Sequence, residues 1–159
     1  MDDVTIALAI HVLAVVLWIG GVAMVTTVLL PAVRGFKSAE ERIAFFETIE
    51  RRFAWQARGT TLLAGASGFY MVYRLNLWSS FLTVAYWWLS AMVAVWLLFT
   101  LMLFIIEPLF LHRRLGPSAR RAPQITFARL QRFHWIVLML SLVTIFGAVA
   151  GSHGLSFFR

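Results

Sequence analysis

Four histidines are the residues of this chain whose chemistry best suits a metal ion. They are His11, His112, His134 and His153, and the sequence contains no cysteine. The lack of cysteine excludes disulfide bonds, thiolate metal sites and cysteine nucleophiles. His11 is the single ionisable residue of the apolar stretch IHVLAVVLWIGG, and Trp18 follows two helical turns later on the same face. A histidine in such a setting is a functional candidate, because an unpaired polar group in hydrocarbon is unfavourable.

The composition indicates what kind of molecule holds these histidines. Of the 159 residues, 61% are hydrophobic and 13% are charged, whereas soluble domains average about 25% charged residues. The sequence therefore indicates a membrane protein. Its acidic start, Met1-Asp2-Asp3, lacks the basic region of a signal peptide. We therefore expect the first apolar run to be kept as a span.

Apolar runs of about 20 residues are long enough to cross the hydrocarbon core of a bilayer. Four such spans are predicted, at about 4–33, 56–75, 84–107 and 133–157. Between the first two, Ser38 and Glu41 form a capping box, and apolar residues at helical spacing predict an amphipathic helix over about 38–55. This helix either lies on the membrane surface or extends the second span. The expected fold is all-α: one transmembrane domain over residues 1–159, arranged as an integral membrane four-helix bundle.

The basic residues predict the orientation of these spans. Twelve of the fourteen lie in the loops after the first and third spans, while the second loop holds only Arg74 and the C-terminus only Arg159. By the positive-inside rule, both termini lie on the outer side of the membrane. The two basic loops account for the net charge of +7, so we expect no nucleic-acid partner.

On this frame the histidines form two pairs by depth. His11 and His153 lie towards the outer side, and His112 and His134 towards the inner side. Two histidines facing each other across a helix bundle are the usual axial ligands of a heme iron. The sequence thus predicts one heme b held by His11 and His153, with His112 and His134 as a second site; copper is the alternative metal. The plainer alternatives are an interhelical hydrogen bond for His11 and interfacial roles for His112 and His134.

The surroundings of His11 and His153 suit a flat macrocycle. The stretches AGASG, Ala64–Gly68, and GAVAGSHG, Gly147–Gly154, consist mainly of small residues. They leave room for a porphyrin, or they serve close helix packing. Trp18 either closes the floor of the pocket or packs in the core. Arg74 on the outer side and Arg58 on the inner side are the expected partners of heme propionates.

The first helix also carries a family resemblance. HVLAVVLWIGG followed by LLPAV, with His11, Trp18, Gly21 and Pro31, resembles the CopD-like copper-resistance membrane proteins and the related HemJ-type membrane protoporphyrinogen oxidases. RFAWQARGTTLLAGASGFYM resembles the second helix of the same group. The resemblance to the HemJ type implies heme b with His11 as a ligand, and that to CopD implies copper handling. Four-helix membrane cytochromes b, which exchange electrons with quinones, are similar in their inward histidine pairs.

Together these observations predict a multi-pass protein of the bacterial inner membrane that binds heme b and transfers electrons. Such a protein is in contact with the lipid bilayer and exchanges electrons with a quinone or a redox partner protein. It is either a heme-dependent oxidoreductase or an electron carrier without catalysis of its own. The alternatives are a CopD-type copper transporter, a HemJ-like oxidase and an accessory subunit without cofactor.

Overall fold

The structure is a computed structural model that describes residues 2–36, 38–107 and 123–155. Within these ranges the secondary structure is helical and contains no strand, which confirms the predicted all-α class. In chain order the elements are α1 (Asp2–Met24), η1 (Val25–Leu29), α2 (Leu30–Arg34), α3 (Ala39–Arg74), η2 (Leu77–Leu82), η3 (Val84–Tyr86), α4 (Trp87–Leu101), η4 (Met102–Ile106) and α7 (Pro123–Ser152).

Three of the described helical stretches are long and apolar enough to cross a membrane. They cover Asp2–Arg34, Val84–Ile106 and Ile125–Ser152. Many of their apolar side chains point outwards, such as Leu13 on α1 and Ile136 on α7, each more than 60% exposed. Such outward-facing leucines and isoleucines are the surface that a helix presents to lipid. The molecule is therefore a helical membrane protein in contact with a bilayer.

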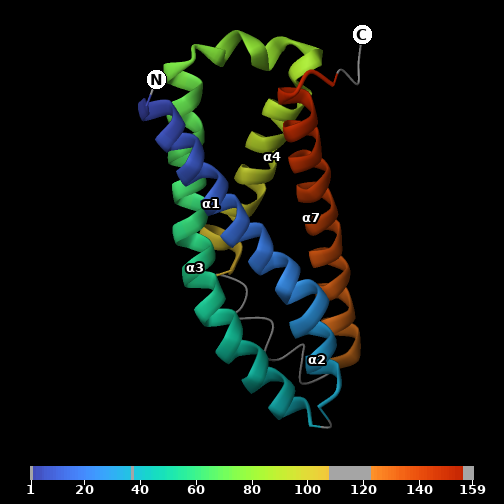
Figure 1. Cartoon of the computed structure of the whole chain (residues 1–159). Helices are drawn as coiled ribbons and strands as arrows, with labels where there is room; N and C mark the ends of the chain where they lie inside the picture. The colour runs from blue at the N-terminus through green and yellow to red at the C-terminus, as the bar shows by residue number, and fades with distance from the viewer. Residues whose placement is uncertain (1, 37, 108–122, 156–159) are drawn as a thin grey trace.

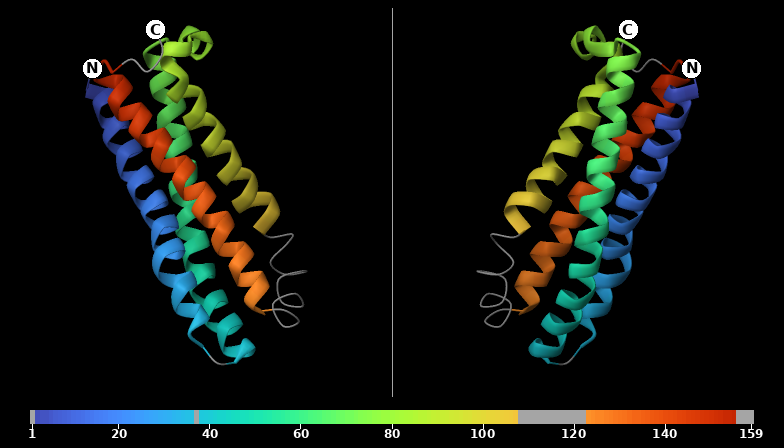
Figure 2. Two further views of the ribbon diagram at one scale, coloured as in Figure 1. Left: turned by 90° about the vertical axis from the view of Figure 1, so that its right-hand side faces the viewer. Right: turned by 90° about the vertical axis from the view of Figure 1, so that its left-hand side faces the viewer.

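The helices pack in the order in which they occur along the chain. α1 lies along α3, and α4 lies along α7 (Figure 1). Fewer contacts join α3 to α4 and α1 to α7. The N-terminus of α1 and the C-terminus of α7 lie at the same end of the structure, seen from three sides in Figures 1 and 2. We call this the terminal end, and we call the opposite end, where α2 and α3 meet, the arginine end.

α3 is a single helix of 36 residues, about 54 Å long at 1.5 Å per residue. It joins the predicted amphipathic stretch to the second predicted span, so the structure shows the alternative in which the former extends the latter. Ser38 is confirmed as the N-cap residue of the predicted capping box, because the Glu41 N–H donates to Ser38 Oγ at 3.1 Å. At the other end the chain leaves the helix through Asn76, whose φ of 52° is left-handed, a conformation that asparagine tolerates.

Two π-helical segments interrupt the apolar helices, and each ends two residues before a proline in the sequence. η1 precedes Pro31, and η4 precedes Pro108. In η1 the Leu30 N–H bonds to the Val25 carbonyl five residues back. The Thr26 carbonyl therefore receives neither the Leu30 N–H nor one from Pro31, which has none. In η4 the Glu107 N–H bonds to the Met102 carbonyl. The Leu103 carbonyl therefore does not receive the Glu107 N–H, and Pro108 has no N–H to offer it.

Side chains from neighbouring helices bond both of these carbonyls. Gln131 Nε2, on α7, donates to the Thr26 carbonyl at 3.3 Å. Arg58 Nε, on α3, donates to the Leu103 carbonyl at 3.2 Å. An unbonded carbonyl inside a membrane costs several kcal/mol, so each of these bonds stabilises the helix before a proline. The polar residues Gln131 and Arg58 thereby join η1 to α7 and η4 to α3.

The small residues of the predicted packing stretches receive aromatic rings from neighbouring helices. A Cβ placed on Gly65 would lie 2.5 Å from Nε1 of Trp96, and one placed on Gly147 would lie 2.5 Å from the Trp87 ring. Gly151 meets Trp88 in the same way. In this structure these stretches therefore serve close packing between helices, which is one of the two predicted roles.

The core consists of two clusters of buried side chains. The first lies midway along the helices and contains Trp18 and Phe99, whose rings meet edge to face with centroids 4.8 Å apart. The second lies at the arginine end, where Phe46 of α3 and Phe127 of α7 pack against Leu30 and its neighbours. The two clusters share the partly buried Phe53.

α7 begins earlier and ends earlier than the predicted span 133–157. It starts at Pro123 and stops at Ser152. Gly154 follows with a φ of 87°, and the Leu155 N–H donates to the Ala150 carbonyl at 3.0 Å. A glycine in the left-handed region is the usual end of a helix. Residues 156 and 157 of the predicted span lie outside the described residues.

Candidate functional site

The His11 side chain is held by α3. Its Nδ1 lies 2.9 Å from the Ala64 carbonyl oxygen and 3.2 Å from Ser67 Oγ. The Ser67 hydroxyl itself donates to the Leu63 carbonyl at 2.6 Å, so its oxygen is available as an acceptor. The imidazole also lies close to Gly68, where an added Cβ would be 3.2 Å from His11 Cε1. The absence of a side chain at Gly68 lets the ring reach the backbone of α3.

These contacts determine which nitrogen of His11 carries the proton. A carbonyl oxygen only accepts hydrogen bonds, so Nδ1 is the protonated nitrogen and donates to Ala64. Nε2 is then the nitrogen with a free lone pair. Histidines that bind metals usually donate their other N–H to a carbonyl or carboxylate in this way, which fixes the ring and makes the ligating nitrogen more basic. The His11 ring is thus prepared to act as a ligand through Nε2.

His153 lies at the terminal end of α7. Its side chain is exposed, and its Nδ1 donates to the Val149 carbonyl of its own helix at 2.8 Å. The same reasoning makes Nε2 the nitrogen with the free lone pair. Ser152 Oγ lies 3.3 Å from the same Nδ1. His153 therefore presents a ligand nitrogen, but at the surface of the molecule.

His11 and His153 have different hydrogen-bond partners: His11 bonds to α3, whereas His153 bonds within α7. His11 lies beside Ala64–Gly68, and Gly65 within this stretch packs against Trp96 of α4. Gly151, two residues before His153, packs against Trp88. Gly65 and Gly151 thus pack against different turns of α4, since Trp88 and Trp96 are eight residues apart. Joint ligation of one iron by both histidines stays a prediction.

The inner histidine pair is described only in part. His134 is partly buried on α7, and its Nδ1 donates to the Leu130 carbonyl one turn earlier at 2.9 Å. His112 lies outside the described residues. Among the residues that the structure describes, no group of three or more His, Asp or Glu side chains is placed to hold a metal ion.

Trp18 lies two turns from His11 on α1 and is 4% exposed. Its indole Nε1 is buried and has no hydrogen-bond partner within residues 2–36, 38–107 and 123–155. Buried indole N–H groups normally find an acceptor. The Trp18 ring packs edge to face against Phe99, but this contact gives its N–H no hydrogen-bond acceptor.

The two arginines predicted to bind propionates are both engaged in ion pairs. Arg74 Nη2 lies 2.6 Å from Asp3 Oδ2, which also accepts the Tyr70 hydroxyl at 2.9 Å. This exposed pair joins the start of α1 to the end of α3. Arg58 Nη2 lies 2.8 Å from Glu107 Oε1 in a more buried setting. Their roles towards a propionate stay predictions.

Sequence reasoning did not single out Glu50. This half-buried residue of α3 lies on the part of the helix that precedes the second predicted span. Burial, with a smaller contribution from the charge of Glu107, raises the pKa of its carboxyl group to about 7. Glu50 therefore changes charge near neutral pH. The sequence offered a weak signal, namely an acidic residue amid the apolar positions Phe46, Ile49 and Phe53.

Comparison with known proteins does not extend this description. No protein-family model, no curated protein and no solved structure matches the chain.

Proposed function

We propose that this chain is a four-span membrane protein that binds heme b through His11 and carries electrons. In this proposal the four spans form a bundle, and the terminal end faces the outer side of the membrane. The arginine end, with its basic loops, faces inwards. Its electron partner is a lipid-soluble quinone or a redox protein.

The observation that carries this proposal is the hydrogen bond from His11 Nδ1 to the Ala64 carbonyl. It orients a neutral imidazole whose Nε2 is a good ligand for iron. The buried Trp18 N–H is a second observation that fits a bound group, because a propionate oxygen would supply the acceptor that this atom lacks. The ligand nitrogen of His11 and the unpaired N–H of Trp18 therefore both fit a bound heme.

When bound, the heme supplies reversible one-electron chemistry. The protein residues orient it and exclude water from it. Ala64 and Ser67 hold the His11 ring. The packed rings of Trp18, two turns further along α1, and Phe99 would exclude water from the bound group. His153, whose Nδ1 is bonded to the Val149 carbonyl, is the second residue that would hold the group.

A visible spectrum of the purified protein, expressed with ample heme, tests the proposal. We expect a sharp Soret band, reducible α and β bands, and a measurable heme content by pyridine hemochrome. His11→Ala should abolish the low-spin signal or convert it to high-spin, because an axial ligand is lost. Trp18→Phe should keep the ligation, since it removes the N–H and leaves the ring.

Two further variants complete the experiment. His134→Ala separates an inner heme from the His11 heme, because loss of about half the heme would reveal a second site. His153→Ala should convert the spectrum to high-spin if His153 is the opposite ligand. A folded His11→Ala protein with an unaltered low-spin spectrum would overturn the proposal. So would a colourless wild-type protein, and stoichiometric copper in that protein would support the copper-transport alternative.

A further inference from the structure

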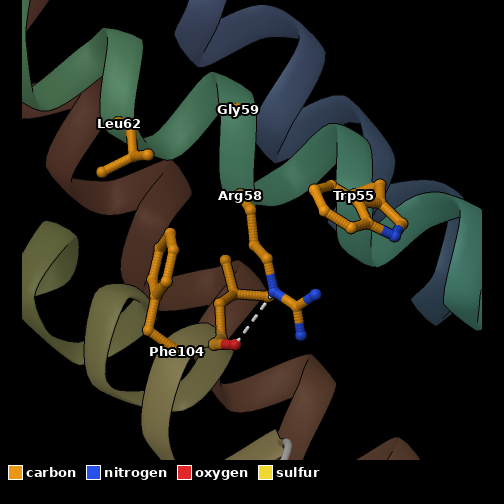
Figure 3. A pocket seen from close by; sticks show the side chains of 6 residues that line it. Trp55, Arg58, Gly59, Leu62 and Phe104 are labelled. Atoms are coloured by element: carbon orange, nitrogen blue, oxygen red, sulfur yellow. Dashed lines mark hydrogen bonds between the residues drawn. The ribbon is translucent and has the colours of Figure 1, made fainter.

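A groove on the side of the molecule lies between α3 and η4, at the arginine end of the second predicted span. It has a volume of about 440 Å³ and is lined by Trp55, Arg58, Gly59, Leu62, Leu103 and Phe104 (Figure 3). Pockets for small ligands commonly have volumes of 300–1,000 Å³. Trp55 and Leu62 are 72% and 53% exposed, so the groove is open at the surface of the molecule and is not enclosed within the helix pack.

The base of the groove is open at Gly59. A Cβ placed on Gly59 would meet nothing within 4 Å among the described residues. The rings of Trp55 and Phe104 stand on opposite sides of Arg58, as Figure 3 shows. A space without a side chain at its base and with aromatic rings at its sides suits a flat ring.

Arg58 supplies the hydrogen-bond donors of the groove. Its Nε bonds to the Leu103 carbonyl, and one Nη2 proton bonds to Glu107 at 2.8 Å. A guanidinium group has five N–H donors, and the described part of the chain uses these two. The side chain is 24% exposed, so its remaining N–H groups are accessible to a ligand.

The charges around Arg58 select a neutral ligand over an anion. Glu107 already pairs with the arginine, and the Glu50 carboxyl group lies near enough for its charge to interact with both. Among the described residues, Glu107 thus already offsets the charge of Arg58, and an anionic ligand would have to compete with this carboxylate. A neutral carbonyl oxygen can accept an Arg58 N–H without adding charge.

We propose that this groove binds the headgroup of a lipid-soluble quinone, with its ring between Trp55 and Phe104 and one carbonyl oxygen accepting a hydrogen bond from Arg58. The groove opens towards lipid, where the isoprenoid tail would remain. This inference deepens the proposed electron-transfer function and rests on it for its biological purpose. Binding itself is measured independently of the heme.

The test uses the full chain in lipid nanodiscs and a decyl-tailed benzoquinone as the probe, with binding followed by titration calorimetry. We expect a saturable component beyond partitioning into protein-free nanodiscs. Gly59→Leu fills the groove and should weaken binding at least tenfold. The matched control is Gly20→Leu, because Gly20 on α1 also has open space around its Cβ position and lies outside the groove; it should change binding less than twofold.

Further measurements keep the test decisive. Gly59→Ala adds one methyl group in open space, so it reports partial weakening if the leucine variant fails to fold. Decylbenzene, which lacks carbonyl oxygens, should show no saturable binding. The proposal is overturned if the wild-type protein binds no quinone, if Gly59→Leu and Gly20→Leu bind equally, or if decylbenzene binds as well as the quinone.

The heme content of the same samples separates the two proposals. Heme without quinone binding would overturn the quinone site and leave the proposed function standing. Quinone binding without heme would overturn the proposed heme function and leave the quinone site standing.

Discussion

Glu50 couples protonation to the stability of the arginine end. Its pKa rises from 4.5 to about 7 in the folded protein, because the carboxyl group is partly buried and is repelled by Glu107 and Glu47, while Arg58 opposes the rise. The folded state therefore binds a proton more tightly than the unfolded state. The resulting stabilisation is complete below pH 4.5 and is lost as the pH rises through 7.

We accordingly expect the wild-type protein to lose stability between pH 5 and pH 8, and Glu50→Gln to lose less. The expected difference is about 1–2 kcal/mol, since a full shift of this size overstates the effect for a side chain with access to water. Denaturation in detergent micelles across this pH range measures it. Glu41→Gln, an exposed carboxyl group near the start of α3, is the control. An identical pH slope in wild type and Glu50→Gln would contradict the assignment.

The sequence identified His11 but not its partners, and the reason is physical. A lone histidine in an apolar run is conspicuous, whereas the Ala64 carbonyl that holds it is a backbone group that every residue carries. Which carbonyl lies opposite depends on the register of two helices whose contacting residues are 53 positions apart. The bond from Arg58 to the Leu103 carbonyl could not be predicted either, because it depends on a π-helical turn that the sequence pattern does not reveal.

At the scale of helices, each proline and the polar residue that compensates it form one unit. Gln131→Ala leaves the Thr26 carbonyl without its side-chain donor, and we expect it to cost about 1–3 kcal/mol of unfolding free energy. Pro31→Ala restores a backbone N–H to the helix. In the presence of Pro31→Ala, the Gln131→Ala substitution should therefore cost much less.

A double-mutant cycle measures this coupling. The four proteins are wild type, Gln131→Ala, Pro31→Ala and the double variant, and their unfolding free energies are compared in one detergent. We expect a coupling of about 1 kcal/mol or more, since the two residues act on the same carbonyl. Additive effects would show that the carbonyl finds another donor or needs none.

Hydropathy predicted the helices better than their boundaries. The three most apolar stretches were recognisable because each contains few charged residues. The continuity of α3 was not, since an amphipathic pattern over 38–55 serves equally in a separate surface helix and in an extension. The early start of α7 was hidden by Arg129 and Arg132, which lie on a helix that projects beyond the apolar region.

For the whole molecule, the distribution of basic residues predicts which end faces the cytoplasm. The structure places the two termini at one end and the junction of α2 and α3 at the other (Figure 1). Reporter fusions at either terminus should therefore give the same result, and by the positive-inside rule they should read outside. A reporter inserted after Gly35 should read inside. An inside signal at the C-terminus would reverse the orientation and exchange the two histidine pairs.

The length of α3 divides the molecule between two solvents. Its 36 residues extend about 54 Å, whereas the hydrocarbon core of a bilayer is about 30 Å thick. We therefore expect the part of the second cluster around Phe46 and Phe127, which lies beyond the predicted spans, to be in water, and the cluster of Trp18 and Phe99 to be in lipid. Water drives this part of the second cluster together, and this drive weakens on cooling. The cluster of Trp18 and Phe99 is held by van der Waals packing, because lipid supplies no hydrophobic driving force between helices. Cold should thus loosen the projecting end of the molecule first and leave the membrane-embedded core intact.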